Sequence, residues 1–192
     1  MLMREILVED QSFSYEIRWA KEHEWDQAMK LIWETFLEFE ANDYSPKGVA
    51  DFKEFLFDGT LRKNFLKGEY QLAVAVLKDP AWVHTVTMSS ENADEDKSNE
   101  PCEKIIGAAS LRNTNFLSLL FVDKNYHKKG IGAALLDMLC EYLKDEAGVQ
   151  FIHLASSPYA VGLYLKQGFH ATDSELQIAG IRVTPMEKHF TK

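Results

Sequence analysis

Residues 121–134 read Phe-Val-Asp-Lys-Asn-Tyr-His-Lys-Lys-Gly-Ile-Gly-Ala-Ala, and they mark the point where a strand gives way to a helix. The first backbone N–H groups of a helix have no acceptor inside it, and with the helix dipole they form an anion site. Gly130 and Gly132 carry no β-carbon, so an anion can approach the backbone closely. Lys128 and Lys129 add positive charge beside them. The stretch therefore predicts a phosphate-binding turn, although two glycines at this spacing are equally typical of a plain tight turn.

The glycine spacing excludes two common nucleotide sites. A dinucleotide-binding turn has a third glycine three residues after the second, and that position holds Leu135. No acidic partner for a ribose follows about 20 residues further on. The P-loop pattern of nucleotide triphosphatases is absent as well.

The turn resembles motif A of the GNAT acetyltransferases, a (Gln/Arg)-x-x-Gly-x-(Gly/Ala) signature that follows a strand and opens a helix. The resemblance implies that the backbone N–H groups of Lys128 to Ala133 hold the pyrophosphate of acetyl-CoA, the co-substrate. His127 stands where the family usually has Gln or Arg. The cofactor-binding residues implied by the family are Leu120, Phe121, Val122, His127, Lys128, Lys129, Gly130, Ile131, Gly132, Ala133, Ser157 and Tyr164.

Residues 157–169 resemble a second stretch of the same family, N-x-x-A-x-x-x-Y-x-x-x-G-F, with Tyr164 and Gly168 in register. Ser157 replaces the usual Asn, which keeps a hydroxyl and loses an amide. The resemblance implies that the Tyr164 hydroxyl protonates the departing thiolate of CoA, the role of a general acid. The alternative is that Tyr164 is an amphipathic wall residue whose hydroxyl is satisfied elsewhere.

Hydrophobic periodicity predicts the remaining elements. Strands are expected at residues 13–19, 70–77, 105–111, 116–122, 150–155 and 181–186, with a tight turn at 113–115. A first helix is indicated by an apolar stripe formed by Trp25, Ala28, Met29, Ile32 and Phe36. Further helices are expected at about 49–56, 130–144 and 157–167, the last with Ser157 as its cap, Pro158 at its first position and Gly168 as a left-handed end.

This order of elements indicates a mixed α/β (α+β) domain. The resemblance implies the GNAT fold, a central, mixed, mostly antiparallel twisted sheet that splays between two central strands and is flanked by helices. We expect one domain over residues 1–192, with an acceptor-side half at 13–103 and an acetyl-CoA-binding half at 104–192. Six of the fifteen residues from Ser89 to Glu103 are acidic. We expect a mobile loop there, and the alternative is an acidic lure for a basic substrate.

The acceptor side of the site is less well marked. The resemblance makes Phe36, Glu40 and Tyr44 candidate acceptor-binding residues, because in relatives the loop after the first helix roofs the acceptor pocket. An amine with a pKa near 10 needs a base. The strand at 116–122 carries no carboxylate, so the base has no assigned residue, and the candidates are Glu38, Glu40, Asp43 and His153.

Composition limits the class of protein. A formal net charge of −9 disfavours a nucleic-acid partner. The apolar runs fall far short of the roughly 20 residues of a membrane helix, and the N-terminus does not resemble a signal peptide. The two cysteines, Cys102 and Cys140, indicate neither a disulfide scaffold nor a metal site. We therefore expect a cytoplasmic protein without a metal or a membrane partner, and whether it forms a homodimer stays open.

The expected activity is transfer of an acetyl group from acetyl-CoA to a primary amine of a small molecule or peptide, by direct attack in a ternary complex. The alternative is a non-catalytic acetyl-CoA-binding sensor or structural subunit.

Overall fold

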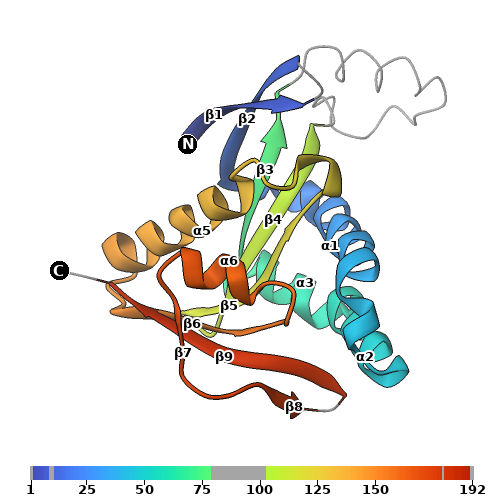
Figure 1. Cartoon of the computed structure of the whole chain (residues 1–192). Helices are drawn as coiled ribbons and strands as arrows, with labels where there is room; N and C mark the ends of the chain where they lie inside the picture. Colours follow the sequence, from blue (N-terminus) through green and yellow to red (C-terminus); the bar gives the residue numbers. More distant parts are fainter. Residues whose placement is uncertain (1, 9–10, 79–102, 179, 191–192) are drawn as a thin grey trace.

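The structure, a computed structural model, describes residues 2–8, 11–78, 103–178 and 180–190 (Figure 1). Among these residues, nine strands form one continuous sheet in the order β1-β2-β3-β4-β5-β6-β9-β7, with β8 paired to β9. Every pairing is antiparallel except that of β5 with β6. The strands are β1 (Leu2–Val8), β2 (Gln11–Trp19), β3 (Gln71–Leu77), β4 (Lys104–Arg112), β5 (Phe116–Val122), β6 (Phe151–Ser156), β7 (His170–Ala171), β8 (Leu176–Ile178) and β9 (Ile181–His189).

Helices cover both faces of this sheet (Figure 1). The α-helices are α1 (Trp25–Phe39), α2 (Pro46–Phe57), α3 (Gly59–Leu66), α5 (Ile131–Glu141) and α6 (Val161–Lys166). Shorter turns of helix are η1 (Glu22–Glu24), η2 (Ala41–Asp43), η3 (Lys124–Tyr126) and η4 (Tyr142–Glu146), the last a π-helical continuation of α5.

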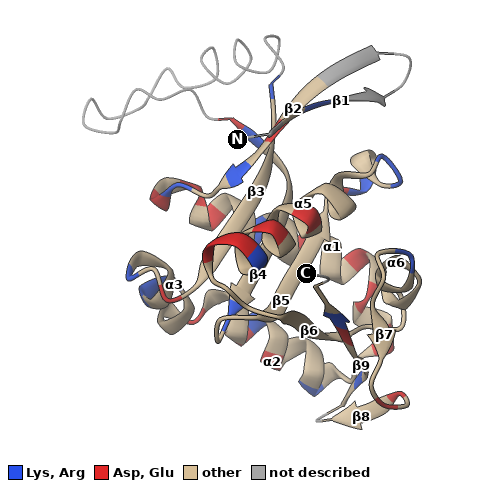
Figure 2. Ribbon diagram, turned by 90° about the vertical axis from the view of Figure 1, so that its left-hand side faces the viewer, with Lys and Arg blue, Asp and Glu red and all other residues tan. Residues whose placement is uncertain are grey.

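Strands β3 and β4 are buried on both faces, which explains their mostly apolar sequence. In β3, Leu72, Val74 and Val76 face a core shared with α1, α2 and α3. Ala73 and Ala75 face a second core, shared with α5 and α6. The side chains of one strand therefore divide between the two cores in strict alternation, as the pleat requires. In Figure 2 the charged segments lie mainly on helices and turns, and the central strands are largely uncharged.

The predicted fold class is confirmed, and most elements lie where periodicity placed them. The strand expected at 116–122 has those bounds, and Asn113 and Thr114 take the left-handed conformation of a tight turn. Strands β1, β7 and β8 and helix α3 were not predicted. The acidic stretch expected to be mobile lies outside the described residues, apart from Glu103. Glu103 pairs with Arg18, at 2.7 Å, and with Lys78, so it ties β4 to β2 and β3.

The helix expected from Ser157 begins later, at Val161. The N–H group of Ala160 donates to the Ser157 carbonyl (3.1 Å), which closes a separate turn over residues 157–160. Ala160, not Ser157, precedes the helix, and no side chain caps it. The expected cap was therefore wrong. The other end was predicted correctly, since Gly168 is left-handed with φ of +83°.

Candidate active site

Strands β5 and β6 separate soon after they meet. Their parallel pairing joins only Phe116 to His153 and Leu117 to Leu154. On its other side β5 contains a bulge at Ser118, because Leu117 pairs with Leu111 and Leu119 with Ser110. A bulge bends its strand and increases the local twist. The bend therefore falls where β5 turns away from β6.

The separation leaves a small cavity, which we call the gap cavity, of about 80 Å³. Its walls come from both strands and from the segments that follow α1 and precede α6. It is lined by Glu40, Tyr44, Phe52, Leu117, Ser118, Leu119, Leu120, Phe121, Leu154, Ala155, Ser156, Ser157, Ala160 and Tyr164.

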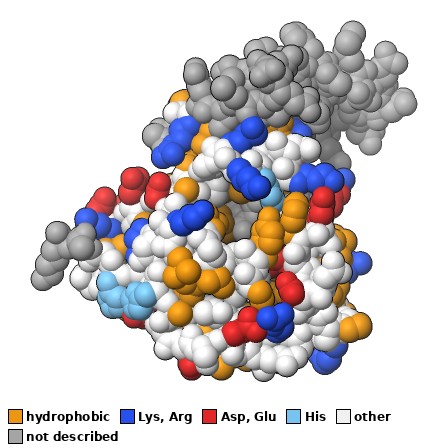
Figure 3. Space-filling model, in the orientation of Figure 1, with side chains coloured by type: hydrophobic (Ala, Val, Ile, Leu, Met, Phe, Trp, Pro, Cys, Tyr) orange, Lys and Arg blue, Asp and Glu red, His pale blue; other side chains and the backbone are white. Residues whose placement is uncertain are grey.

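A larger groove of about 510 Å³ shares four residues with the gap cavity: Glu40, Leu120, Phe121 and Ala160. We call it the cofactor groove, after the ligand that the sequence predicts for its residues. It follows the turn into α5 and is lined further by Thr35, Phe39, Val122, Tyr126, His127, Lys128, Gly130, Gly132, Ala133, Tyr159, Gly162, Leu163 and Lys166. Figure 3 shows the molecule hollowed near the middle of this face, with basic side chains above the hollow and hydrophobic side chains beside it.

The turn into α5 has the backbone geometry of an anion site. Lys128 and Gly130 are both left-handed, with φ of 59° and 80°. The first bond inside the helix runs from the Ala134 N–H to the Gly130 carbonyl. The N–H groups of residues 131–133 therefore have no acceptor within the helix. Turns of this kind gather N–H groups into an anion-binding concavity, and the cations Lys128 and Lys166 line the same groove.

Most of the predicted cradle residues line the groove, and two of them, Lys129 and Ile131, do not. The side chain of Ile131 is buried in the core, and that of Lys129 is not part of the groove wall. His127 has a specific structural role. Its Nε2 donates to the Val122 carbonyl (2.7 Å), so the last residue of β5 is bonded to the turn that follows it. Its ring packs on Phe39 at 4.7 Å.

Tyr164 lies on α6 and lines the gap cavity, as expected from the register of the motif. It is only 6% exposed and packs edge-on against Phe169 at 5.4 Å. Burial raises the pKa of the Tyr164 hydroxyl well above its usual value, and the nearby Glu40 carboxylate raises it further. Tyr164 therefore keeps its proton at neutral pH and can donate it.

Ser157 faces the same cavity but does not cap a helix. Among the described residues its hydroxyl is the one buried side-chain oxygen that forms no hydrogen bond of normal geometry. The hydroxyl nevertheless lies close enough to the Glu40 carboxyl to lower the pKa of that group. A buried hydroxyl without a well-formed hydrogen bond is costly, and within the described residues the Glu40 carboxyl is the side chain that can offset part of this cost.

Glu40 follows the last residue of α1 and lines both the gap cavity and the cofactor groove. The residue as a whole is half-buried, while its carboxyl group is much more deeply enclosed. Burial is the main reason that the pKa of Glu40 is raised to about 7, and the charge of Asp43 adds to the effect. The neighbouring Tyr44 hydroxyl also has a raised pKa, through its own burial and the charges of Glu40 and Asp43.

The other candidate bases are engaged elsewhere. Asp43 pairs with Arg182 at 3.5 Å, and Glu38 pairs with Lys124 at 3.1 Å. His153 packs between Phe116 and Phe151 and lines neither the gap cavity nor the cofactor groove.

The candidate acceptor residues separate into two kinds. Glu40 and Tyr44 line the gap cavity. Phe36 is completely buried and lines neither cavity, and it packs on Phe52 at 4.2 Å and on Tyr44 at 5.0 Å. Phe52, within the helix expected at about 49–56, lines the gap cavity. Its helical spacing gave no sign of this role, because core and cavity residues share the apolar face of a helix.

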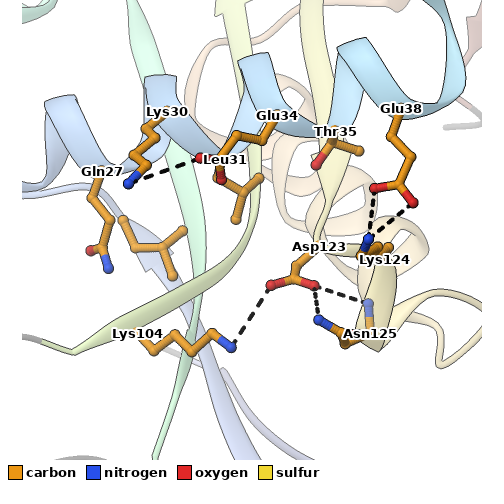
Figure 4. Close-up of a pocket in the computed structure, with 11 residues that line it drawn as sticks. Gln27, Lys30, Leu31, Glu34, Thr35, Glu38, Lys104, Asp123, Lys124 and Asn125 are labelled. Atoms are coloured by element: carbon orange, nitrogen blue, oxygen red, sulfur yellow. Dashed lines mark hydrogen bonds and ion pairs between the residues drawn. The ribbon is translucent and has the colours of Figure 1, made fainter.

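A third cavity, of about 590 Å³, lies between α1 and the ends of β4 and β5 (Figure 4). Its charged side chains pair with one another: Lys30 with Glu34 (3.9 Å), Lys104 with Asp123 (3.8 Å) and Lys124 with Glu38 (3.1 Å). In Figure 4 the Lys30–Glu34 pair lies along α1, whereas the Lys124–Glu38 pair joins α1 to the segment after β5. Glu38 therefore points away from Tyr164 and the gap cavity.

Within the described part of the chain, no group of three or more His, Cys, Asp or Glu side chains is arranged to hold a metal ion. None of the helices described is long and apolar enough to cross a membrane.

Comparison with known proteins gives the family. A family model described as the acetyltransferase (GNAT) domain matches residues 81–190. The chain therefore belongs to the GNAT acetyltransferases, enzymes that use acetyl-CoA as the acetyl donor. No curated protein sequence matches the chain.

Solved structures share the fold at low sequence identity. A GCN5-related N-acetyltransferase from Rhodopseudomonas palustris is 17% identical with a TM-score of 0.66, and the match covers 99% of each chain. The PaiA N-acetyltransferase from Thermoplasma acidophilum, in complex with coenzyme A, is 18% identical with a TM-score of 0.63, covering 92% of this chain and 99% of its own. A mutant of the spermidine N-acetyltransferase SpeG from Vibrio cholerae is 17% identical with a TM-score of 0.53, covering 91% of this chain and 93% of its own.

Proposed function

We propose that the protein transfers an acetyl group from acetyl-CoA to a primary amine of a small molecule or peptide, by direct attack in a ternary complex. The observation that carries the proposal is the continuity of the two cavities. The cofactor groove begins at the α5 turn and meets the gap cavity between β5 and β6, where Tyr164 lies. A pyrophosphate on the turn therefore directs the acyl end of the cofactor toward the gap.

The β5 backbone orients the thioester in this proposal. Leu120 and Val122 lie beyond the last residue of β5 that pairs with β6, so their edge of the strand faces the cavities. A backbone N–H there hydrogen-bonds the acyl arm and polarises the acetyl carbonyl as the oxyanion develops. The Val122 carbonyl is already bonded by His127, so the contact from Val122 is made by its N–H group. Tyr164 donates the proton that the departing thiolate needs.

The acceptor enters beside Tyr44 and Phe52. These aromatic side chains and the Glu40 carboxylate suit a primary ammonium on a slender apolar chain. One side is closed by the β8–β9 hairpin: the Ser45 N–H donates to the Gly180 carbonyl (2.9 Å), and Arg182 pairs with Asp43. This closure favours a small molecule or a peptide terminus over the middle of a folded chain. The SpeG relative is a spermidine N-acetyltransferase, an example of a small amine acceptor on this fold.

The test is amine-dependent release of free CoA thiol. The protein is incubated with acetyl-CoA and a panel of polyamines, amino sugars, amino-acid amides and short peptides, and products are identified by mass. A tertiary-amine analogue of each acceptor is the matched control, because it has no N–H to replace. We expect thiol release and N-acetylation with at least one primary amine and none with its analogue. Tight acetyl-CoA binding without transfer to any amine would instead favour a non-catalytic sensor or structural subunit.

A further inference from the structure

Glu40 has a position that no other acidic residue of the described chain shares. It is the one carboxylate that lines the gap cavity, and also the one carboxylate that lines the cofactor groove. It lies where the two cavities meet, together with Leu120, Phe121 and Ala160. An acceptor amine must reach this junction in order to meet the thioester.

We propose that Glu40 is the general base of the reaction, and that its carboxylate takes a proton from the acceptor ammonium before attack. The proposal rests on the proposed acetyl transfer and assigns the step that the family resemblance leaves without a residue.

The surroundings of Glu40 leave its carboxylate available. No Lys, Arg or His within the described residues forms an ion pair with it, whereas Glu38 and Asp43 are both paired. The polar groups that face it are Asp43 on η2, Tyr44, the Ser157 hydroxyl and Tyr164 on α6. None of them is a cation that would hold it permanently ionised. The cation that this arrangement lacks is supplied by the ammonium of the acceptor.

The proton affinity of Glu40 suits this role. Burial raises its pKa to about 7, so near neutral pH it is partly ionised and also able to accept a proton. An ordinary exposed carboxylate, with a pKa near 4, is a much weaker base. The same charge raises the pKa of Tyr164. An ionised Glu40 therefore favours the neutral form of Tyr164, which is the form that can donate a proton.

The protons balance as follows. The acceptor ammonium loses one proton to the Glu40 carboxylate, and the free amine forms the new C–N bond at the acetyl carbonyl. The C–S bond then breaks, its electron pair leaves with sulfur, and the Tyr164 hydroxyl protonates the thiolate. The amide nitrogen gives up a second proton, which restores Tyr164, and Glu40 returns its proton to solvent. The ammonium thus loses two protons, one to the CoA thiol and one to water.

The experiment compares Glu40→Gln and Glu40→Asp with Glu38→Gln, measured from about pH 5 to about pH 9 on an amine that wild type acetylates. Glu38 is the matched control because it lies two residues earlier in the same chain segment and lines the third cavity. In wild type we expect kcat/KM to rise with pH through about 7, as Glu40 ionises. The rate should then stay level up to about pH 9, because an amine with a pKa near 10 is still mostly the ammonium that Glu40 deprotonates.

Glu40→Gln should lower kcat/KM on the order of 100-fold or more and abolish the rise through neutral pH, with acetyl-CoA affinity unchanged. Glu40→Asp should recover part of the rate and restore a pH-dependent limb, because it returns a carboxylate. Glu38→Gln should match wild type.

A second readout does not depend on turnover. A carboxyl whose pKa is higher in the folded than in the unfolded protein binds more protons when folded, so it destabilises the fold as pH rises between the two values. The melting temperature of wild type should therefore drop relative to Glu40→Gln by roughly 3–10 °C between about pH 5 and about pH 8.

The outcomes separate the two proposals. A Glu40→Gln protein that keeps the wild-type rate and pH profile overturns the assignment of Glu40 as the general base. The proposed acetyl transfer is unaffected by that result. If the difference in melting temperature between wild type and Glu40→Gln does not change with pH, Glu40 is an ordinary carboxylate. That result also overturns its role as the base. A wild-type protein that acetylates no amine overturns the proposed function, and the base role with it.

Discussion

At the scale of single residues, the proposed reaction depends on the protonation states of Tyr164 and Glu40. Tyr164 was predictable because its spacing from Gly168 matches a family motif, and the structure places it in the gap cavity. Ser157 and Glu40 were harder to interpret. A serine before a proline is typical of a helix cap, and a glutamate at the end of an amphipathic helix is typical of a solvated face. The two side chains form one cluster because the end of β6 lies near the end of α1. Hydrophobic periodicity describes single elements, so it does not predict a contact between two of them.

Replacing Tyr164 by Phe tests the acid. The substitution keeps the ring and its packing against Phe169 and removes the hydroxyl alone, so acetyl-CoA affinity should barely change. Turnover should fall about 10- to 1000-fold, the scale of a positioned acid. Tyr15→Phe is the control: the Tyr15 hydroxyl bonds Arg4 of β1, and neither residue lines either cavity. It should cost about 1 kcal/mol of stability and leave kcat unchanged. Equal kcat in wild type and Tyr164→Phe would remove Tyr164 from the mechanism.

At the scale of elements, the strand β5, the turn after it and helix α5 form one unit. The apolar run from Phe116 to Val122 and the glycines at 130 and 132 made this unit predictable from local sequence. The bulge at Ser118 was not predictable, because a bulge depends on the register with β4 rather than on the residues of β5. The late start of α6 has a similar cause: the turn over residues 157–160 satisfies its own backbone before the helix begins.

Gly132→Leu tests the cradle. A β-carbon at Gly132 would make only ordinary contacts with Val122 (3.7 Å) and Leu163 (3.9 Å), so the fold can accept a side chain there. Both neighbours line the cofactor groove, so the rest of the leucine would occupy the groove. By calorimetry, acetyl-CoA affinity should fall on the order of 10-fold or more, with little change in melting temperature. Gly59→Leu, at an exposed helix position where a β-carbon meets nothing within 4 Å, should bind as wild type does. Undiminished affinity in Gly132→Leu would argue against the cradle.

At the scale of the whole molecule, two cores on opposite faces of one sheet hold the two halves of the site together. The core shared with α1 carries Glu40 and Tyr44 to the gap, and the core shared with α5 and α6 carries the cradle and Tyr164. The division arises because each helix has one apolar stripe and β3 places apolar side chains on both faces of the sheet. The identity of the acceptor was not predictable, since it depends on how the α1–α2 connection meets the β8–β9 hairpin, a contact between segments more than 100 residues apart.

The most direct test of this account is amide hydrogen exchange of the wild-type protein with and without saturating acetyl-CoA. We expect slower exchange in two segments, residues 118–122 of β5 and residues 128–134 at the start of α5, because their N–H groups are the ones proposed to bind the acyl arm and the pyrophosphate. Helices α2 and α3, which form no part of the cofactor groove, should be unaffected. Protection confined to other segments, such as the walls of the cavity in Figure 4, would contradict the assignment. So would unchanged exchange throughout the chain at a concentration of acetyl-CoA that calorimetry shows to be saturating.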